Sequence, residues 1–238
     1  MTAPTHYQIH DAIYKHRRRD GRYPGWAAPE VYELILPEWE RIIDSADLDL
    51  NLPALDLGCG AGQITRILAS KGLNCIGMDI SETAIEWARE NIEEMSSKAS
   101  FFCGDLTAPE TFANYKEYFG SVVDSHFLHC IIGNHRKQLL DQVYSVLKNG
   151  GKFVVNTMIF RDGKIPKGEY WQKHYDETTK TQIQNGISTR FIASQNHIIS
   201  ELMDARFCIQ HVSINPGAED DEMDLDTLVV IAKKLESV

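Results

Sequence analysis

Three glycines at alternate positions, with an acid two residues before the first, form the strongest chemical pattern in this sequence. They are Gly58, Gly60 and Gly62, and the acid is Asp56. Glycine is needed where the backbone angle φ is positive or where a side chain would collide with a ligand. A carboxylate beside such a turn suits a ligand that carries an ammonium group, because opposite charges attract. The pattern therefore predicts a small-molecule site on bare backbone.

The glycine spacing differs from that of the dinucleotide-binding fingerprint. That fingerprint is G-x-G-x-x-G, and its glycines let a pyrophosphate approach the N-terminus of a helix. Here the spacing is G-x-G-x-G, and Gln63 occupies the position of the late glycine. The sequence therefore favours a ligand without a phosphate, although a turn that joins a strand to a helix without binding anything stays open.

Residues 54–63 resemble the nucleotide-binding motif of class I S-adenosylmethionine-dependent methyltransferases. The resemblance extends over roughly residues 50–234 and implies S-adenosyl-L-methionine as methyl donor. It says almost nothing about the methyl acceptor, because the loops that bind acceptors vary on a shared fold. Within the motif, the residues expected to bind the cofactor are Asp56, Gly58, Cys59, Gly60, Gly62 and Gln63.

Two further acids follow predicted strands. Asp79 lies 23 positions after Asp56, where an acid can accept hydrogen bonds from a ribose. In the family that the chain resembles, an acid at the position of Asp105 accepts from the adenine amino group, as an ionised carboxylate can. The alternatives are that Asp79 is only an acid at a helix N-terminus and that Asp105 is only a turn residue. The cofactor-binding residues predicted here are Asp79, Ile80, Gly104, Asp105 and Leu106.

The segment after the fourth predicted strand is the candidate catalytic region. His126 and His129 are candidate general bases, since the carboxyl edge of an open α/β sheet is where ligands bind. Asp124 is a third candidate base, or it binds the ammonium of the cofactor. Each histidine has a structural alternative, in which it only hydrogen-bonds the backbone of a loop.

The same region matches the resembling family only in part. Phe119, Leu128 and His129 fit its pattern, whereas Gly120 replaces the usual acid. The chain lacks the Asn/Asp-Pro-Pro-aromatic run of enzymes that methylate amino groups of nucleobases, and the Pro-Cys pair of those that methylate cytosine carbon. These absences leave the acceptor open.

The pattern of apolar residues predicts the elements that position these groups. Apolar runs that end in Gly or an acid indicate buried strands, and apolar residues at helical spacing indicate the helices between them. We expect an α/β fold: a seven-stranded, mostly parallel Rossmann-like methyltransferase sheet flanked by helices, with a reversed last strand. The predicted strands cover residues 54–57, 73–79, 100–106, 119–123, 152–159, 207–212 and 227–233, and the predicted helices include 64–71, 81–95, 131–147 and 193–205.

The domain prediction has two parts. Residues 1–50 form an N-terminal helical lid or extension, with a kink or a new helix at Pro37, and residues 51–238 form the S-adenosylmethionine-binding domain. The polar insertion at about residues 160–190 is expected to cover the acceptor site, and Tyr170, Trp171, His174 and Tyr175 either wall that site or pack the insertion. The basic run at residues 15–22 either belongs to a lid that binds a carboxylate or is a solvated surface.

Composition limits the function further. The chain has 24 basic and 34 acidic residues and a formal charge of −10. This charge repels the phosphate backbone of a nucleic acid and so disfavours a nucleic-acid partner. Five scattered cysteines without a C-x-x-C pair predict neither disulfides nor a metal site, and they fit a cytoplasmic setting. No apolar run is long enough to span a membrane, and the oligomeric state is left open.

The preferred hypothesis is a methyltransferase that acts on a small molecule by in-line methyl transfer. In such a reaction the enzyme chiefly aligns the acceptor and excludes water, and a base is needed only if the acceptor carries a proton. One alternative is a methyltransferase for RNA or protein, supported by the basic run alone. The other is a non-catalytic S-adenosylmethionine binder or an NAD-dependent enzyme.

Overall fold

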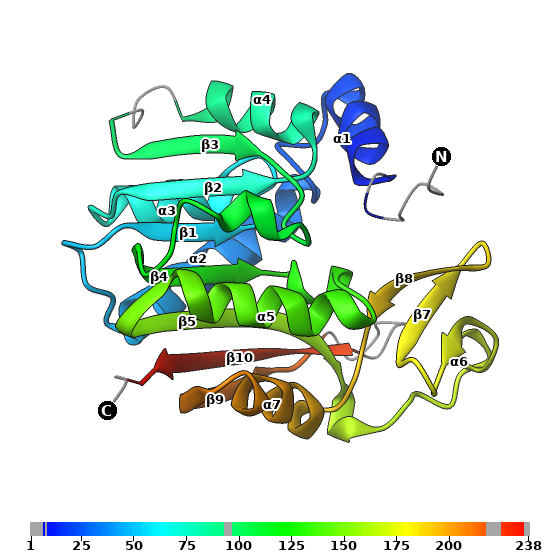
Figure 1. The fold of residues 1–238 in the computed structure, drawn as a ribbon. Helices are drawn as coiled ribbons and strands as arrows, with labels where there is room; N and C mark the ends of the chain where they lie inside the picture. Colours follow the sequence, from blue (N-terminus) through cyan, green and yellow to red (C-terminus); the bar gives the residue numbers. More distant parts are fainter. Residues whose placement is uncertain (1–6, 8, 93–96, 218–224, 236–238) are drawn as a thin grey trace.

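One seven-stranded sheet forms the centre of the molecule in the computed structural model, which describes residues 7, 9–92, 97–217 and 225–235. The strand order is β3-β2-β1-β4-β5-β10-β9 (Figure 1). Neighbouring strands from β3 to β5 are parallel, whereas β10 is antiparallel to both β5 and β9. This confirms the predicted fold class. The strands are β1 (Ala54–Leu57), β2 (Cys75–Asp79), β3 (Ala99–Cys103), β4 (Phe119–Ser125), β5 (Leu147–Phe160), β9 (Phe207–Asn215) and β10 (Leu225–Lys234).

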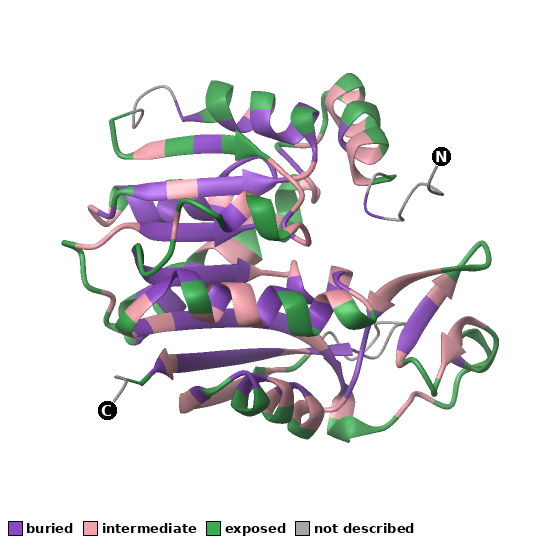
Figure 2. Cartoon of the chain, in the orientation of Figure 1, coloured by how far each residue is buried: buried purple, intermediate pink, exposed green. Residues whose placement is uncertain are grey.

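Helices cover both faces of this sheet. Helices α5 (Asn134–Val146) and α7 (Gln195–Asp204) pack on one face, and α2 (Pro29–Ala46) and α3 (Gln63–Ser70) pack on the other. Successive strand residues alternate between the two cores: Val122 joins the first and Val123 the second. A strand that is buried on both faces needs apolar residues at every position. The continuous apolar runs of the sequence have this cause, and Figure 2 shows the central strands as largely buried.

Helix α4 (Glu82–Asn91) begins directly after β2. The hydroxyl of Ser81 accepts a hydrogen bond from the Ala84 N–H at 3.0 Å, which is the N-cap that the sequence indicates. The helix packs through Ile85 against Cys59 and Phe101. The part of the predicted helix at residues 93–95 lies outside the described residues.

Two boundaries differ from the sequence-based expectation. Helix α2 runs through Pro37, so no new helix begins there. The predicted helix at residues 131–147 is shorter, because α5 ends at Val146 and β5 already starts at Leu147, with a register shift against β4 between Phe119 and Ser121. The Asn-Gly-Gly sequence at residues 149–151 therefore lies inside an irregular part of β5, which pairs with β4.

The insertion after β5 is an ordered substructure. It contains η5 (Arg161–Gly163), α6 (Glu169–His174) and a three-stranded antiparallel sheet of β6 (Tyr175–Asp176), β7 (Thr181–Gln184) and β8 (Ile187–Phe191). Trp171 is 1% exposed and packs with Phe160 and Ile192. The expectation of an irregular polar loop is therefore wrong: a few apolar residues at distant positions suffice for a small core, and the sheet satisfies the backbone.

The N-terminal helix α1 (Ile9–Asp20) and strand β8 both lie beyond the edge of the sheet at which β1, β2 and β4 end (Figure 1). Residues 15–20 of the basic run at residues 15–22 are helical and not a loop. Within the described part of the chain, no helix is both long and apolar enough to cross a bilayer.

Candidate active site

The glycine turn after β1 has the backbone that its residue types predict. Gly58, Gly60 and Gly62 have φ angles of +63°, +54° and +84°. A Cβ on Gly60 would lie 2.4 Å from the hydroxyl oxygen of Tyr14, and one on Gly58 would lie 2.5 Å from the Phe127 ring. Glycine is therefore required both by the left-handed backbone and by side chains that come close from α1 and from the β4–α5 connection.

Asp56 is buried immediately before this turn. Its Oδ2 accepts a hydrogen bond from the Thr65 hydroxyl at 2.6 Å, whereas its Oδ1 has no hydrogen-bond partner. Burial raises the pKa of Asp56 to about 7, although the bonds to Thr65 oppose this shift. A buried carboxylate oxygen without a partner is costly unless a cation or donor binds it. Asp56 thus has the free acceptor that an ammonium-bearing ligand needs.

Asp79 connects the ends of β1 and β2. One carboxylate oxygen accepts from the Gly60 N–H at 3.0 Å, and the other accepts from the Ser81 N–H at 2.8 Å. Burial raises the pKa of Asp79 to about 6, against the opposing effect of these backbone bonds. Each carboxylate oxygen can accept more than one hydrogen bond, so both structural bonds leave acceptor capacity for a ligand.

The four predicted residues that follow β2 and β3 lie beside Asp79 but do not line the cavity described below. The Gly104 N–H donates to the Asp79 carbonyl at 2.9 Å, and Leu106 is part of the hydrophobic core. Asp105 accepts from the N–H and the hydroxyl of Thr107, at 2.8 and 2.7 Å, as a turn aspartate does. Ile80 packs against the core. Their role toward a cofactor stays a prediction.

Asp124 organises the connection after β4. Its Oδ1 accepts from the N–H groups of Phe127 and Leu128 at 2.8 and 2.9 Å, which caps the short helix η4 (Leu128–Cys130). Burial raises the pKa of Asp124 to about 7. The side chain is fully buried and does not line the cavity. Its Oδ1 contacts position η4, whereas its Oδ2 is buried and has no hydrogen-bond partner among the described residues, so its role toward a ligand stays a prediction.

His126 and His129 lie on either side of this turn and both line the cavity. Their rings are 5.6 Å apart in an edge-to-face arrangement, and His126 has a φ of +60°. Burial lowers the pKa of His126 to about 4, and the positive charge of Arg190 adds to the effect. Burial also lowers the pKa of His129 well below its ordinary value, and the Nδ1 of His129 has no partner. Both imidazoles are therefore neutral near pH 7 and can accept a proton.

A cavity of about 550 Å³ joins these groups. It is bounded by α1, the segment 23–28, the start of α2, the glycine turn, the β4–α5 connection and β8. The predicted cofactor and catalytic residues that reach it are Asp56, Gly58, Cys59, Gly60, Gln63, Asp79, His126 and His129. Gly62 does not line the cavity, since its Cα faces Phe101 and Ala88.

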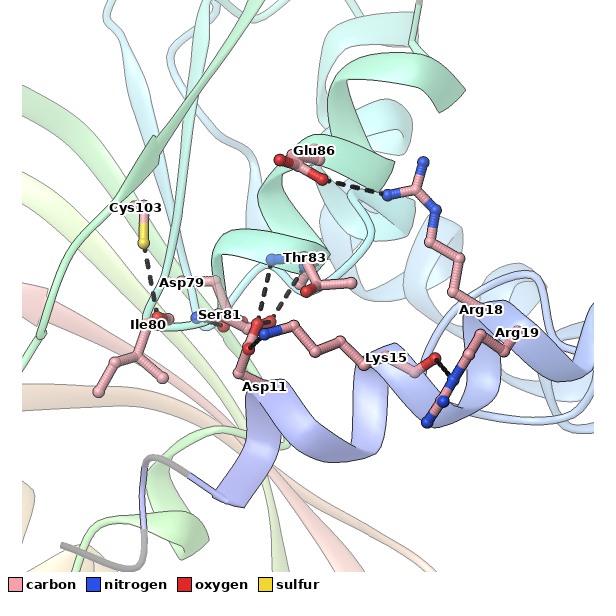
Figure 3. Close-up of polar contacts among 11 residues, drawn as sticks. Asp11, Lys15, Arg18, Arg19, Asp79, Ile80, Ser81, Thr83, Glu86 and Cys103 are labelled. Atoms are coloured by element: carbon pink, nitrogen blue, oxygen red, sulfur yellow. Dashed lines mark hydrogen bonds and ion pairs between the residues drawn. The ribbon is translucent and has the colours of Figure 1, made fainter. Parts of the chain in front are cut away.

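The N-terminal segment forms one wall of the cavity and is fixed to the cofactor side. Figure 3 shows Asp11 of α1 at the start of α4, where its Oδ1 accepts from the Ser81 hydroxyl at 2.8 Å and the Thr83 N–H at 3.1 Å. The Gln63 amide donates to the Pro24 carbonyl at 2.7 Å, and the Tyr32 hydroxyl accepts from the Trp26 N–H at 3.1 Å. These contacts hold the segment over the glycine turn.

Sequence analysis missed several residues of the cavity. Arg190 of β8 lies at the end of the predicted insertion but is not among the residues expected to wall the acceptor site, and Tyr14 carries no motif. The aromatic residues proposed for the acceptor wall, Tyr170, Trp171 and Tyr175, do not reach the cavity and pack the insertion instead. The sequence pattern of β8 could have identified Arg190. Side chains alternate between the two faces of a strand, so Arg190 points away from the face on which the apolar Phe191 is buried.

Comparison with known proteins shows what the central part of the chain resembles. Residues 55–155 match a family model described as a methyltransferase domain. A solved S-adenosylmethionine-dependent methyltransferase from Methanosarcina mazei is similar, with a TM-score of 0.66, 22% identity, and coverage of 82% of this chain and 98% of that one. The chain contains a class I S-adenosylmethionine-dependent methyltransferase domain.

Curated relatives of this methyltransferase domain differ in their acceptors. The release factor glutamine methyltransferase of Bacillus cereus is 37% identical over 82 residues, which are 34% of this chain and 29% of that protein. The 2-heptyl-1-hydroxyquinolin-4(1H)-one methyltransferase of Mycobacteroides abscessus is 26% identical over 131 residues, 55% of each chain. The chain thus matches less than two thirds of either relative.

S-adenosyl-L-methionine is the cofactor of this domain family, and the residues of the methyltransferase domain fit it. The unpartnered Oδ1 of Asp56 can accept from an ammonium group. The glycine turn leaves backbone exposed where side chains would intrude, and Asp79 retains acceptor capacity for ribose hydroxyls. The fit rests on the chemistry of these groups, and the predicted adenine contact of Asp105 is not part of it.

Proposed function

We propose that this protein transfers a methyl group from S-adenosyl-L-methionine to a small-molecule acceptor. The observation that carries the proposal is the single cavity that joins Asp56, the glycine turn and Asp79 to His126 and His129. The cofactor supplies an electrophilic methyl group on a sulfonium. The chain's own residues then have to bind the cofactor, hold the acceptor and exclude water.

On the cofactor side, Asp56 would bind the ammonium group and Asp79 the ribose. The glycine turn would let the cofactor approach the backbone. Arg17 of α1 lines the same part of the cavity, with its guanidinium 4.8 Å from the Tyr23 ring centroid and 4.9 Å from that of Trp26. It is the group of the N-terminal segment best suited to a carboxylate.

On the acceptor side, His126 and His129 would accept a proton from the acceptor. Because burial lowers the pKa of both imidazoles, each is neutral at pH 7. One ring nitrogen of each is therefore unprotonated and can accept a proton from the substrate. The aromatic residues Tyr14, Tyr32 and Phe127 supply apolar walls. A concave cavity with aromatic walls suits a small molecule better than it suits a polymer.

The basic run gives little support to the RNA or protein alternative. Lys15 pairs with Asp11 at 2.7 Å, Arg18 pairs with Glu86 and Glu90, and Arg22 pairs with Asp20. These three cations are paired with acids of the same chain, which reduces the positive charge that the run offers to a polymer. The relative from Mycobacteroides abscessus is named for a small aromatic acceptor, whereas that from Bacillus cereus is named for a protein.

Titration calorimetry tests the cofactor part of the proposal. We expect S-adenosylmethionine and S-adenosylhomocysteine to bind in the micromolar range and NAD not to bind. Heat with NAD alone would overturn the proposal. His126→Gln and His129→Gln should bind S-adenosylhomocysteine as the wild type does, because neither residue is predicted to contact the cofactor's charged ends.

Labelled S-adenosylmethionine with a size-fractionated extract tests the acceptor part. Label in the low-mass fraction supports a small-molecule acceptor, and label in polypeptide or RNA contradicts it. In the low-mass assay, His126→Gln and His129→Gln should lower turnover by about 10²–10⁴-fold if they act as bases.

A further inference from the structure

Arg190 is the charged residue of the cavity that no part of the cofactor hypothesis uses. It lies on β8, opposite Gln182 of β7, and it lines the cavity. Its guanidinium has no hydrogen-bond or ion-pair partner among the described residues. An arginine is always charged in proteins, so this position places a permanent positive charge at the cavity.

The orientation of Arg190 follows from its neighbour in the strand. The guanidinium of Arg136 lies 3.8 Å from the centroid of the Phe191 ring, on the core side of β8. Successive strand residues point to opposite faces, so Arg190 points away from that core. The pKa values of His126 and His129 are both lowered by its charge, which agrees with a position beside the two candidate bases.

Nearby acids do not neutralise Arg190. Glu201 is bound at 2.9 and 2.7 Å by both arms of Arg136, so its carboxylate is already used. Asp124 is buried and bonds the backbone of η4. Arg190 contrasts in this respect with Arg161, which pairs with Asp226 at 3.0 Å. Among the described residues, no carboxylate forms an ion pair with Arg190.

The charges of the cavity divide into two regions. The acidic lining residues, Asp56 and Asp79, belong to the cofactor side, and Arg17 lies with Tyr23 and Trp26 on that same N-terminal wall. Arg190 enters from the opposite wall, next to His126 and His129. Ammonium and carboxylate groups of the cofactor have partners on the first wall, which leaves Arg190 for the other reactant.

We propose that the methyl acceptor is an anion whose carboxylate or phosphate group binds Arg190, so that Arg190 positions the acceptor beside the two histidines. This inference rests on the proposed methyltransferase function. A guanidinium binds either group through paired, charge-assisted hydrogen bonds. The whole chain carries a charge of −10, which repels anions, so a local cation is needed to admit one.

Binding of aromatic probes to protein saturated with S-adenosylhomocysteine tests this inference. Benzoate and phenyl phosphate are the anionic probes, and benzamide is the neutral control of similar shape. We expect at least one anion to bind at least about tenfold more tightly than benzamide, as a charge-assisted hydrogen bond allows. Whether benzoate or phenyl phosphate binds more tightly shows whether the site prefers a carboxylate or a phosphate. Equal affinities, or no binding of either anion at millimolar concentration, would overturn the inference.

Two variants make the test specific to Arg190. Arg190→Gln should lose the preference for the anion, and Lys164→Gln should retain it, because Lys164 is an exposed cation of the same insertion that does not line the cavity. A preference that persists in Arg190→Gln overturns the inference.

Affinity for S-adenosylhomocysteine separates this inference from the proposed function. Wild type and Arg190→Gln should bind it equally, which also shows that the variant is folded. A loss in Arg190→Gln as large as the loss of the anion would assign Arg190 to the cofactor carboxylate and overturn the inference. Failure of the wild type to bind it would overturn the proposed function itself.

Discussion

Asp56 combines deep burial with an unused carboxylate oxygen, so its ionisation is linked to both stability and ligand binding. Its pKa is raised from 3.8 to about 7 by burial. Between these values the folded state binds more protons than the unfolded state. The contribution of Asp56 to the free energy of unfolding therefore falls as pH rises through this window.

Asp56→Asn removes this titration. We expect the wild type to lose stability relative to Asp56→Asn as pH rises from about 4 to about 7, measured by urea unfolding at several pH values. A constant difference across the window would contradict the shifted pKa. Wild-type affinity for S-adenosylmethionine should rise over the same range, because an ammonium binds the ionised carboxylate, and the variant should show no such rise.

Alanine substitutions at Gly60 and Gly72 distinguish the cost of backbone strain from the cost of a steric clash. Both have positive φ angles, +54° and +99°, but a Cβ meets Tyr14 only at Gly60 and open space at Gly72. Gly72→Ala should cost about 1–2 kcal/mol of stability, the strain of a left-handed residue, and retain S-adenosylhomocysteine binding. Gly60→Ala should cost more and weaken binding. Equal behaviour in urea unfolding and calorimetry would mean that Tyr14 moves away freely.

At the scale of elements, helix α1 is attached to the cofactor side by one partly buried contact and one exposed contact. Asp11 binds the N-terminus of α4, whereas Arg18 pairs with Glu86 (Figure 3). Arg18 also pairs with Glu90, and the side chains of Glu86 and Glu90 are 57% and 58% exposed. Exposed ion pairs contribute about 0–1 kcal/mol, and a donor left without its acceptor costs about 1–3 kcal/mol. Asp11 should therefore dominate the attachment of α1.

Hydrogen exchange of residues 9–20 checks this difference. Asp11→Ala should speed exchange of α1 and weaken S-adenosylhomocysteine binding, because the helix then opens at lower free energy. Arg18→Ala should change both much less. Similar rates in the two variants would show that α1 is held mainly by the packing of Tyr14 and not by its polar contacts.

The same measurement tests whether both cavity walls close over the ligands. Part of the N-terminal lid or extension, residues 10–35, lines the cavity, and the insertion at about residues 160–190 is a packed substructure that reaches the cavity through Arg190. We expect S-adenosylhomocysteine to protect residues 9–26 and to leave the hairpin of β7 and β8 unchanged. Unaltered exchange of residues 9–26 would contradict a role of this segment in closure.

For the whole molecule, ligand binding and unfolding are linked by mass action. At 100 times its Kd, S-adenosylhomocysteine should stabilise the protein by about 2.7 kcal/mol, seen as a higher Tm. NAD at the same concentration should leave Tm unchanged, since the glycine spacing does not match a pyrophosphate site. A Tm increase with NAD equal to that with S-adenosylhomocysteine would contradict the assigned specificity of the turn.

The sequence determined the features that depend on short-range stereochemistry and periodicity. Gly58 and Gly60 encode a left-handed turn, because only glycine adopts it at low cost. The apolar runs of β1 and β4 encode strands that are buried on both faces. With the acid Asp79 at a fixed distance along the chain, these local features are sufficient to predict the sheet and that Asp56, the glycine turn and Asp79 line one cavity.

Only the tertiary structure decided which distant groups meet at that turn. Tyr14 lies against Gly60, 46 positions away in sequence, and Arg190 reaches the histidines of another connection. Asp124 uses Oδ1 to bind the backbone N–H groups at the start of η4, a contact that its sequence position does not reveal. The physical reason is that periodicity fixes which face of an element is apolar, whereas the contacts of its polar face depend on how separate elements pack together.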